Sequence, residues 1–347
     1  MTPRNDNVRD ERGVAILYVA VFLVSSLWLV SLAIDMGKLM TTKTELQRAA
    51  DAAALAGASA LNPEDGSLIQ ATARARAAAV AAANTALQER SAPVIIDPNA
   101  DVDFPGPGVN TIRVTVHREG GNAMTTIFAR SLGIGSLDLH ANASAKAVPL
   151  TQVCEGLIPF SAVGVPGGFS KTCGSRDTLK TNPSGSNGGN FQLLNFPDCA
   201  EGDCGDGPNG NGAAKIKWYI ENGYCCCIDI GTTFVDTKPG NNVGPVRTGL
   251  QDRWDADTDR TPNICYQQYS GNRMRVLPVP LVETYQNMSG RTDARITGFA
   301  AFFMLERPTG NGNSSQIVGQ FIDYIAPGAG SNGPPPPNAL YTIRLIE

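Results

Sequence analysis

The sequence contains little histidine and little charge. Only two histidines occur in 347 residues, so few imidazoles are present for His-based catalysis or a His-rich metal site. Charged residues make up 17%, and 28 basic against 32 acidic residues give a net charge of −4. A strongly basic face is typical of nucleic-acid-binding proteins, and this balance does not favour one. We therefore expect no nucleic-acid partner.

Common catalytic motifs are also missing from the sequence. It has no G-x-S-x-G, no H-E-x-x-H and no Walker loop. Its Gly-rich stretches follow no clear strand and open no clear helix, so they do not indicate phosphate binding. We expect no enzymatic activity and no cofactor.

Cysteine is absent from residues 1–153 and concentrated after them. Eight cysteines suit an oxidising compartment, and the scarcity of histidine favours disulfides over a zinc site. Adjacent cysteines rarely pair with each other, so we expect the three consecutive ones to reach different partners. Eight cysteines allow 105 full pairings, so the connectivity stays open. The disulfide candidates are Cys154, Cys173, Cys199, Cys204, Cys225, Cys226, Cys227 and Cys265.

One long apolar run is present, at residues 13–34, where 22 residues contain no charge. At about 1.5 Å per residue such a helix crosses a hydrocarbon core of roughly 30 Å. A cleaved signal peptide is the alternative, but its apolar region is shorter and ends at a small-residue cleavage site. Helix-forming residues follow here instead. We expect an uncleaved transmembrane helix at residues 14–34.

The flanking charges do not decide the orientation of this helix. Three arginines precede it, and two lysines and an arginine follow it closely, so the positive-inside count is equal. The cysteines favour export of the C-terminal part. The expected organisation is a cytoplasmic tail at 1–13, the span at 14–34, an Ala-rich helical hairpin with a small α/β unit at 35–150, and a periplasmic β-rich disulfide-bonded domain at 151–347.

The helix is expected to continue well beyond the membrane. No strong breaker occurs between residues 14 and 61, and Ala dominates the outer part until Pro63 stops it. Ser67 and Gln70 have capping-box spacing for a second helix that reaches about Arg90. The small residues either pack these two helices together within one chain or form an assembly surface for other subunits. The sequence leaves both interpretations open.

After Pro93 the hydrophobic period changes. Residues 112–116 alternate as a half-buried strand, and residues 137–147 alternate likewise with Ala on one face. Between them, the apolar residues of 124–132 have helical spacing, and Gly133 is the expected stop. Both histidines fall on the polar faces of these strands, where we expect ordinary surface residues.

The second half is expected to be mainly β, as a sandwich or a barrel. Together with the helices this gives an α+β fold. Short strand-like runs alternate there with Gly, Pro and Asn. The clearest are residues 215–220, 273–285, 294–305, 315–325 and 340–347.

Three alternating carboxylates, Asp255, Asp257 and Asp259, are the best metal candidates. Such side chains in a loop can converge on a hard cation such as Ca²⁺. An EF-hand loop is not formed, because Arg260 stands where Gly is needed and Tyr266 where Glu is needed. The alternative is a solvated acidic loop with neighbouring arginines as counter-charges.

Residues 12–61 resemble the Tad/Flp pilus-assembly family of TadE/TadG-like proteins. The resemblance covers the uncharged run, its flanks and the Ala-rich stretch after it. The residues that carry it are Arg12, Gly13, Asp35, Gly37, Leu46, Gln47, Ala50, Asp51, Ala54 and Gly57.

This resemblance implies a single-pass protein of the bacterial inner membrane with a pilin-like helix-plus-small-sheet unit. It implies a structural component of a type IV-related pilus assembly or secretion apparatus, which contacts other assembly or pilin-like subunits through its N-terminal helices. Tyr18 stands where processed pilins carry Glu, and no Asp-x-Ser-x-Ser run occurs, so neither prepilin processing nor a von Willebrand-type metal site is implied. An anchored binding or adhesin module is the alternative, and an exported enzyme is a third hypothesis.

Overall fold

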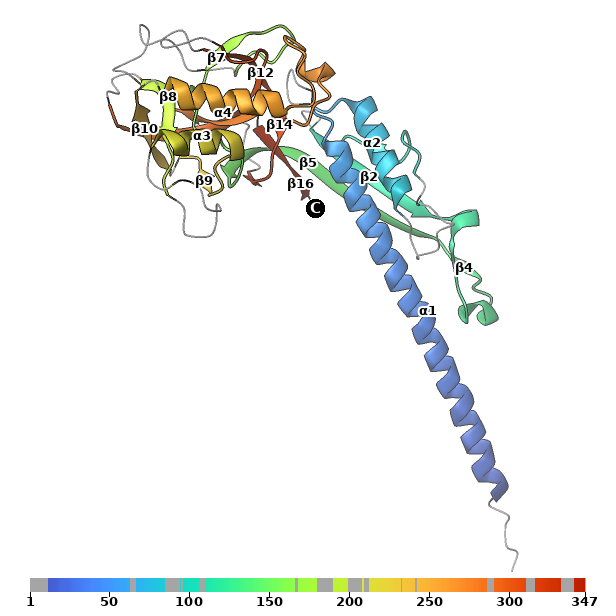
Figure 1. Cartoon of the computed structure of the whole chain (residues 1–347). Coiled ribbons are helices and arrows are strands. Elements are labelled where there is room, and N and C mark those ends of the chain that lie inside the picture. The colour runs from blue at the N-terminus through green and yellow to red at the C-terminus, as the bar shows by residue number, and fades with distance from the viewer. Residues whose placement is uncertain are drawn as a thin grey trace, which may run out of the picture.

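A single long helix, α1 (Arg12–Ala58), extends away from the rest of the molecule (Figure 1). The computed structural model describes residues 12–62, 67–84, 94, 96–106, 110–165, 168–179, 190–198, 208, 212–231, 233–240, 242–285, 290–309, 316–331 and 340–346. With 47 residues α1 is about 70 Å long. The prediction of one continuous helix from the membrane run into the Ala-rich stretch is confirmed.

Helix α2 (Gln70–Ala83) packs against the outer end of α1. The predicted second helix is present, but the expected capping box is wrong, because the helix begins at Gln70 and not directly after Ser67. The residue at the N-cap is Ile69, which has no side chain able to accept a hydrogen bond, and Ser67 lies outside the helix. The predicted continuation at 85–90 lies outside the described residues.

The first sheet covers the Ala-rich faces of the two helices and has the strand order β1–β2–β5–β16–β14. Strands β15 and β9 also pair with β5. The long strand β5 is antiparallel to β2 on one side and to β16 on the other. The strands are β1 (Val102–Asp103), β2 (Thr111–Arg118), β5 (Leu139–Val153), β9 (Ile228–Asp229), β14 (Tyr324–Ile325), β15 (Ala329–Gly330) and β16 (Leu340–Ile346).

The second sheet forms the distal part of the molecule and has the order β6–β11–β12–β10–β8, with β13 paired to β12 and β7 to β13. Helices α3 (Ala213–Asn222) and α4 (Val243–Ala256) lie next to each other beside it (Figure 1). Its strands are β6 (Ala162–Val163), β7 (Asp177–Leu179), β8 (Asn190–Asn195), β10 (Phe234–Pro239), β11 (Val276–Val282), β12 (Asp293–Met304) and β13 (Ile317–Ile322).

The fold is α+β, with the long apolar helix at the N-terminus and a mainly β C-terminal region. The strands expected within 273–285, 294–305, 315–325 and 340–347 are confirmed. The strand expected at 215–220 is wrong, because this segment belongs to α3. Its buried residues Ile216, Tyr219 and Ile220 have helical rather than alternating spacing.

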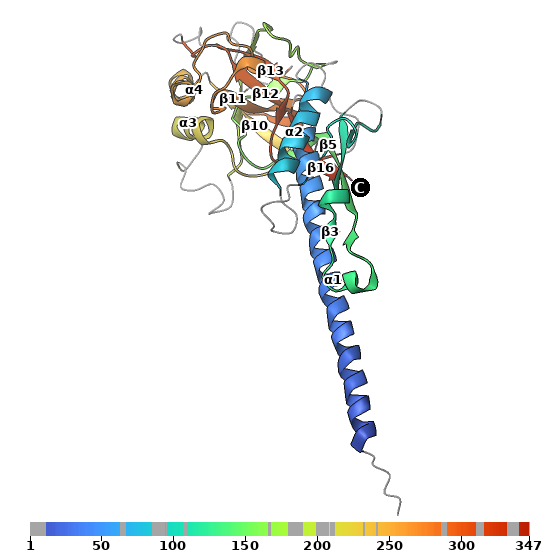
Figure 2. The same cartoon turned by 90° about the vertical axis from the view of Figure 1, so that its right-hand side faces the viewer.

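A small hairpin leaves the first sheet between β2 and β5 and lies along α1 (Figure 2). It consists of β3 (Met124–Thr125) and β4 (Ser136–Leu137), which enclose the 3₁₀-helix η2 (Ala129–Leu132). The helix predicted over 124–132 is therefore wrong. We call residues 127–134, at the end of this hairpin, the tip.

The boundary expected at residue 150 falls inside β5. Residues 144–149 of this strand pair with β16, the last strand of the chain, and residues 150–153 pair with β15 and β9. The C-terminal strand therefore returns to the sheet that packs on the N-terminal helices.

Candidate functional site

The inner half of α1 presents an apolar surface that nothing else in the described chain covers. Its most apolar 18-residue window has a mean hydropathy of 2.4, and none of it is buried. Large side chains are strongly exposed, including Ile16 at 71%, Phe22 at 70% and Leu29 at 70%. By length and composition this helix is able to cross a membrane.

Asp35 is the first charged residue after the apolar run, and it binds the tip. Its carboxylate accepts hydrogen bonds from the backbone N–H groups of Ile127 (2.8 Å), Phe128 (3.0 Å) and Ala129 (2.6 Å). Lys38, one turn later on α1, donates to the carbonyl oxygen of Thr125 at 2.8 Å. The polar boundary of the helix and the base of the tip are thus joined by charge-assisted hydrogen bonds.

These contacts also explain why residues 124–132 do not form the expected helix. The carboxylate of Asp35 takes the three amide protons that begin η2. Gly133 then ends the 3₁₀ turn in the left-handed conformation, with φ of 86°. The hydrogen bonds from Ile127 and Ala129 hold the pKa of Asp35 below its usual value, so the carboxylate stays charged in this position.

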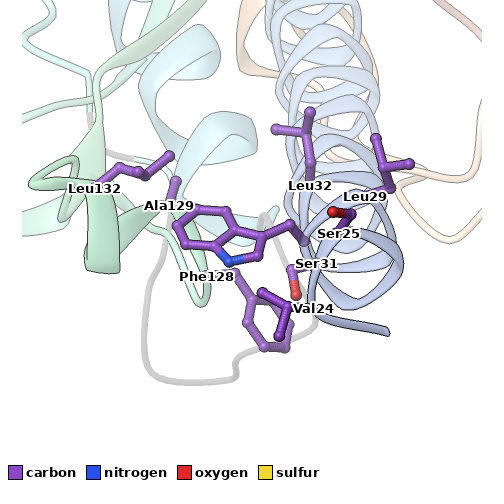
Figure 3. Close-up of a pocket in the computed structure, with 9 residues that line it drawn as sticks. Val24, Ser25, Leu29, Ser31, Leu32, Phe128, Ala129 and Leu132 are labelled. Atoms are coloured by element: carbon purple, nitrogen blue, oxygen red, sulfur yellow. The ribbon is translucent and has the colours of Figure 1, made fainter. Parts of the chain in front are cut away.

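An apolar groove separates the tip from α1. Its volume is about 490 Å³, and Figure 3 shows Leu29 and Leu32 of the helix on one side and Phe128 and Leu132 of the tip on the other. Every large side chain that lines it is apolar. The lining residues are Val24, Ser25, Trp28, Leu29, Ser31, Leu32, Phe128, Ala129 and Leu132.

The small residues of the two helices are used inside the chain. Ala54 of α1 and Ala73 and Ala77 of α2 are fully buried in one core with Ile112 of β2. Gly57 lies so close that a Cβ placed on it would meet the Cδ1 of Ile112 at 2.3 Å. The intramolecular hairpin is therefore the arrangement that the structure contains, and this face is not free for other subunits.

The other residues that carry the family resemblance have separate places. Leu46 and Ala50 are buried in the same core. Gln47 is exposed, and its side-chain amide donates to the carboxylate of Asp51 at 2.9 Å and to the carbonyl of Asn142 at 3.0 Å. A Cβ on Gly37 would meet nothing within 4 Å, so packing does not require glycine there.

The structure places the three candidate calcium ligands with different protein donors. Asp255 forms a two-point contact with Arg307, with nitrogen–oxygen distances of 2.9 and 2.7 Å. Asp257 is buried and accepts from the hydroxyl of Tyr269 at 2.5 Å, whereas Asp259 accepts from the backbone N–H of Ser270 at 3.1 Å.

These contacts do not gather the three aspartates around one point. Among the described residues, no group of three or more His, Cys, Asp or Glu side chains is arranged to hold a metal.

A fully buried arginine organises this acidic loop, and the sequence analysis missed it. The guanidinium of Arg275 donates to the carbonyls of Met304 (2.9 and 2.7 Å) and Asp259 (2.9 Å). It also lies 4.1 Å from the ring centroid of Trp254. In the sequence Arg275 stands two residues after Arg273, and only the apolar residues of β11 that follow it point to burial.

Two disulfides join distant parts of the second half. Cys154 is bonded to Cys227 and Cys173 to Cys265, over separations of 73 and 92 residues. Cys225 and Cys226 are disulfide-bonded as well. The remaining candidates, Cys199 and Cys204, lie outside the described residues.

The two histidines face each other across β2 and β5, with ring centroids 6.5 Å apart. His117 is hydrogen-bonded to Asp101 at 2.9 Å and to Glu119 at 3.1 Å. Burial alone would lower the pKa of His117, but the two carboxylates outweigh it and raise this pKa. These contacts bind the edge of the first sheet together.

Comparison with known proteins identifies the segment that contains this site. No curated protein and no solved structure matches the chain. Residues 13–60 match the family described as Tad, putative Flp pilus-assembly TadE/G-like. The matched residues nearly coincide with helix α1, and they include Asp35 and Gly57. The resemblance noted from the sequence is thus confirmed: residues 13–60 of this chain are similar to the Tad family of putative Flp pilus-assembly TadE/G-like proteins.

Proposed function

We propose that the chain is a membrane-anchored structural component of a Tad/Flp pilus-assembly apparatus. The observation that carries this proposal is the coincidence of the family match, residues 13–60, with one helix whose inner half is apolar and uncovered. Residues 14–34 anchor the chain in the bacterial inner membrane, with residues 1–13 in the cytoplasm and residues 35–347 on the periplasmic or extracellular side. The disulfides support this orientation, because they persist in oxidising compartments.

The fold suggests how such a component contacts other subunits. The Ala-rich faces of α1 and α2 are occupied by their own sheet, which leaves the opposite, exposed side of α1 for lateral contacts. Met36 and Met40 are exposed on this helix, at 49% and 62%, just outside the apolar run. We infer that partner subunits pack along this outer face rather than on the small-residue stripe.

A structural rather than enzymatic role fits the polar groups that the sequence singled out. His117, Asp255, Asp257 and Asp259 all take part in contacts that hold elements of the fold together. Their hydrogen bonds and ion pairs join neighbouring segments of the fold.

The test is co-purification of the full-length chain, carrying a C-terminal tag, from the membranes of cells that make the pilus. We expect pilus-assembly proteins to be recovered with it, and pilus formation to fail when it is deleted. The matched control replaces residues 14–34 by an unrelated span and keeps Asp35 onward. Met40→Glu should weaken recovery of the partners without releasing the chain from the membrane.

Three outcomes would contradict the proposal. Normal pili in the deletion strain would exclude a role in assembly, and loss of surface binding with normal pili would favour the adhesin alternative. A chain that alkali extracts from the membrane would exclude the anchor.

A further inference from the structure

We propose that the tip, residues 127–134, inserts into the bilayer that α1 crosses, so that the chain contacts lipid at two adjacent places. The acyl chains of the leaflet on the side of the C-terminal domain then fill the groove between tip and helix. This inference rests on the membrane anchoring proposed above and adds a second membrane-binding element to it.

The composition and exposure of the tip favour an apolar environment. Four large apolar side chains occur within eight residues, and their exposed fractions are 55% for Ile127, 40% for Phe128, 62% for Leu132 and 47% for Ile134. Clustered exposure of this kind marks an interaction site rather than ordinary surface. Met124, at the base of the hairpin, is by contrast fully buried.

The level of the tip along α1 indicates which environment this is. Phe128 and Leu132 share the groove with Trp28 and Leu32, so they lie at the same level as these residues. Leu32 and Trp28 precede Ile34, the last residue of the apolar run, by two and six positions. At a rise of 1.5 Å per residue, the tip therefore lies about 3–9 Å inside the apolar zone. Interfacial elements reach similar depths, about 5–10 Å, in lipid.

The backbone of the tip is prepared for such an environment. An unpaired amide costs several kcal/mol in hydrocarbon. The amides of residues 127–129 are paired with Asp35, and the amide of Ile134 donates to the carbonyl of Ala129 at 3.1 Å. The hydroxyl of Thr126 donates to the carbonyl of Ile134. The amides of residues 127–129 and 134 are therefore paired within the protein and need no water.

The polar residues around the tip lie where headgroups are expected. Asp35 and Lys38 follow the apolar run directly and hold the base of the hairpin. Arg130 is exposed within the tip, and a long arginine side chain can return its charge to the headgroup region.

A lipid bilayer also explains the groove better than a second protein does. One wall of the groove is the apolar helix itself, from Val24 to Leu32. When this helix spans a membrane, lipid surrounds it at that level, and acyl chains are flexible enough to fill an irregular apolar space. The tip and the helix then form one continuous apolar surface.

Tryptophan fluorescence of the full chain in phosphatidylcholine–phosphatidylglycerol vesicles tests the inference, with acyl chains brominated near the headgroup as quencher. The reporter is Phe128→Trp in a Trp28→Phe background. The matched control is Phe234→Trp in the same background, because Phe234 is 59% exposed on the distal sheet. Trp218 and Trp254 contribute the same background to both variants. We expect strong quenching of the reporter at 128, comparable to that of native Trp28, and none at 234.

The same measurement separates the two proposals. If native Trp28 is quenched but the reporter at 128 is quenched no more than the one at 234, the tip does not enter the bilayer and the inference is overturned, while the anchor stands. If Trp28 is not quenched either, the membrane anchoring itself fails. If the emission at 128 shifts to the blue only at high protein-to-lipid ratio and resists brominated lipid, a second copy covers the tip, which also overturns the inference. Circular dichroism checks that both variants retain the fold.

Discussion

Substitution of Gly57 by alanine tests the packing of α1, α2 and the first sheet most directly. A methyl group on Gly57 would meet the Cδ1 of Ile112 at 2.3 Å, the carbonyl oxygen of Ala73 at 3.2 Å and the Cβ of Ala77 at 3.4 Å. Ile112 is fully buried, so its side chain has no empty space into which it can move freely. The new methyl group therefore requires a change of rotamer or a separation of the two helices.

Two opposing effects decide how much Gly57→Ala changes the free energy of unfolding. Replacement of glycine by alanine within a helix stabilises it by about 1 kcal/mol. Overpacking of a closed core typically costs about 1–3 kcal/mol. We therefore expect Gly57→Ala to lower the free energy of unfolding by up to about 2 kcal/mol.

Gly37→Ala is the matched control on the same helix. A Cβ at position 37 meets nothing within 4 Å, so only the helix propensity acts there. We expect this variant to be neutral or up to about 1 kcal/mol more stable. The difference between the two variants then isolates the packing cost.

The assay is guanidinium unfolding of the full chain in a mild detergent, with hydrogen exchange of the β2 amides to locate the effect. A double-mutant cycle with Ile112→Val identifies the clash, because valine lacks the Cδ1 atom. We expect a coupling energy of about 1 kcal/mol between positions 57 and 112. Equal stability of Gly57→Ala and Gly37→Ala, with additive effects in the cycle, would refute the packing described for Gly57.

Three further predictions concern the tip, the disulfides and the histidine pair. Asp35→Asn removes one acceptor oxygen, so the amides of 124–137 should exchange faster in hydrogen-exchange mass spectrometry. The pKa of Asp35 is lowered on folding, so its carboxylate stabilises the fold above about pH 4, and this stabilisation should be lost as the pH falls further. Replacing Cys154 and Cys227 together by serine opens a 73-residue loop, which should cost about 2–4 kcal/mol in chemical denaturation of the oxidised chain. The pKa of His117 is raised on folding, so the protonated side chain stabilises the fold fully below about pH 6.5, and this stabilisation is lost as the pH rises through the folded-state pKa. The melting temperature of His117→Gln should therefore depend less on pH than that of the unchanged chain, between neutral and mildly alkaline pH.

Elements with a strong local signal could be predicted from the sequence. The uncharged run and the Ala-rich stretch determine α1, and alternation determines β2 and much of β5. By contrast, the sequence analysis gave no helix at α4, where Gly244 and Pro245 weaken the local helix signal at its start. Short amphipathic segments such as α3 fit both a strand and a helix until their neighbours are known.

The candidate site is formed by contacts between residues far apart in the chain, which local sequence patterns do not predict. The tip takes its shape from Asp35, which is 92 residues away from Ile127 in the sequence. Asp35 was identified only as part of a family resemblance, without its partner. In the acidic loop, the sequence pattern showed three carboxylates, but Arg275 and Arg307, which engage the loop, come from later segments. Spacing alone therefore indicated a metal site and could not indicate the protein donors that contact these carboxylates.

Strand β5 joins the part of the molecule that packs on α1 to the distal part. Its 15 residues extend over about 50 Å. It begins one residue after the hairpin that carries the tip, pairs with β2 on the helices, and ends beside β9 in the disulfide-bonded half. No linker interrupts it, and β16 closes it from the other side. A fragment that starts at residue 151 would lack most of this strand and would leave β16 paired with β14 but not with β5. Paired strands, rather than an unpaired linker at residue 150, therefore join the distal part of the molecule to α1 and the tip.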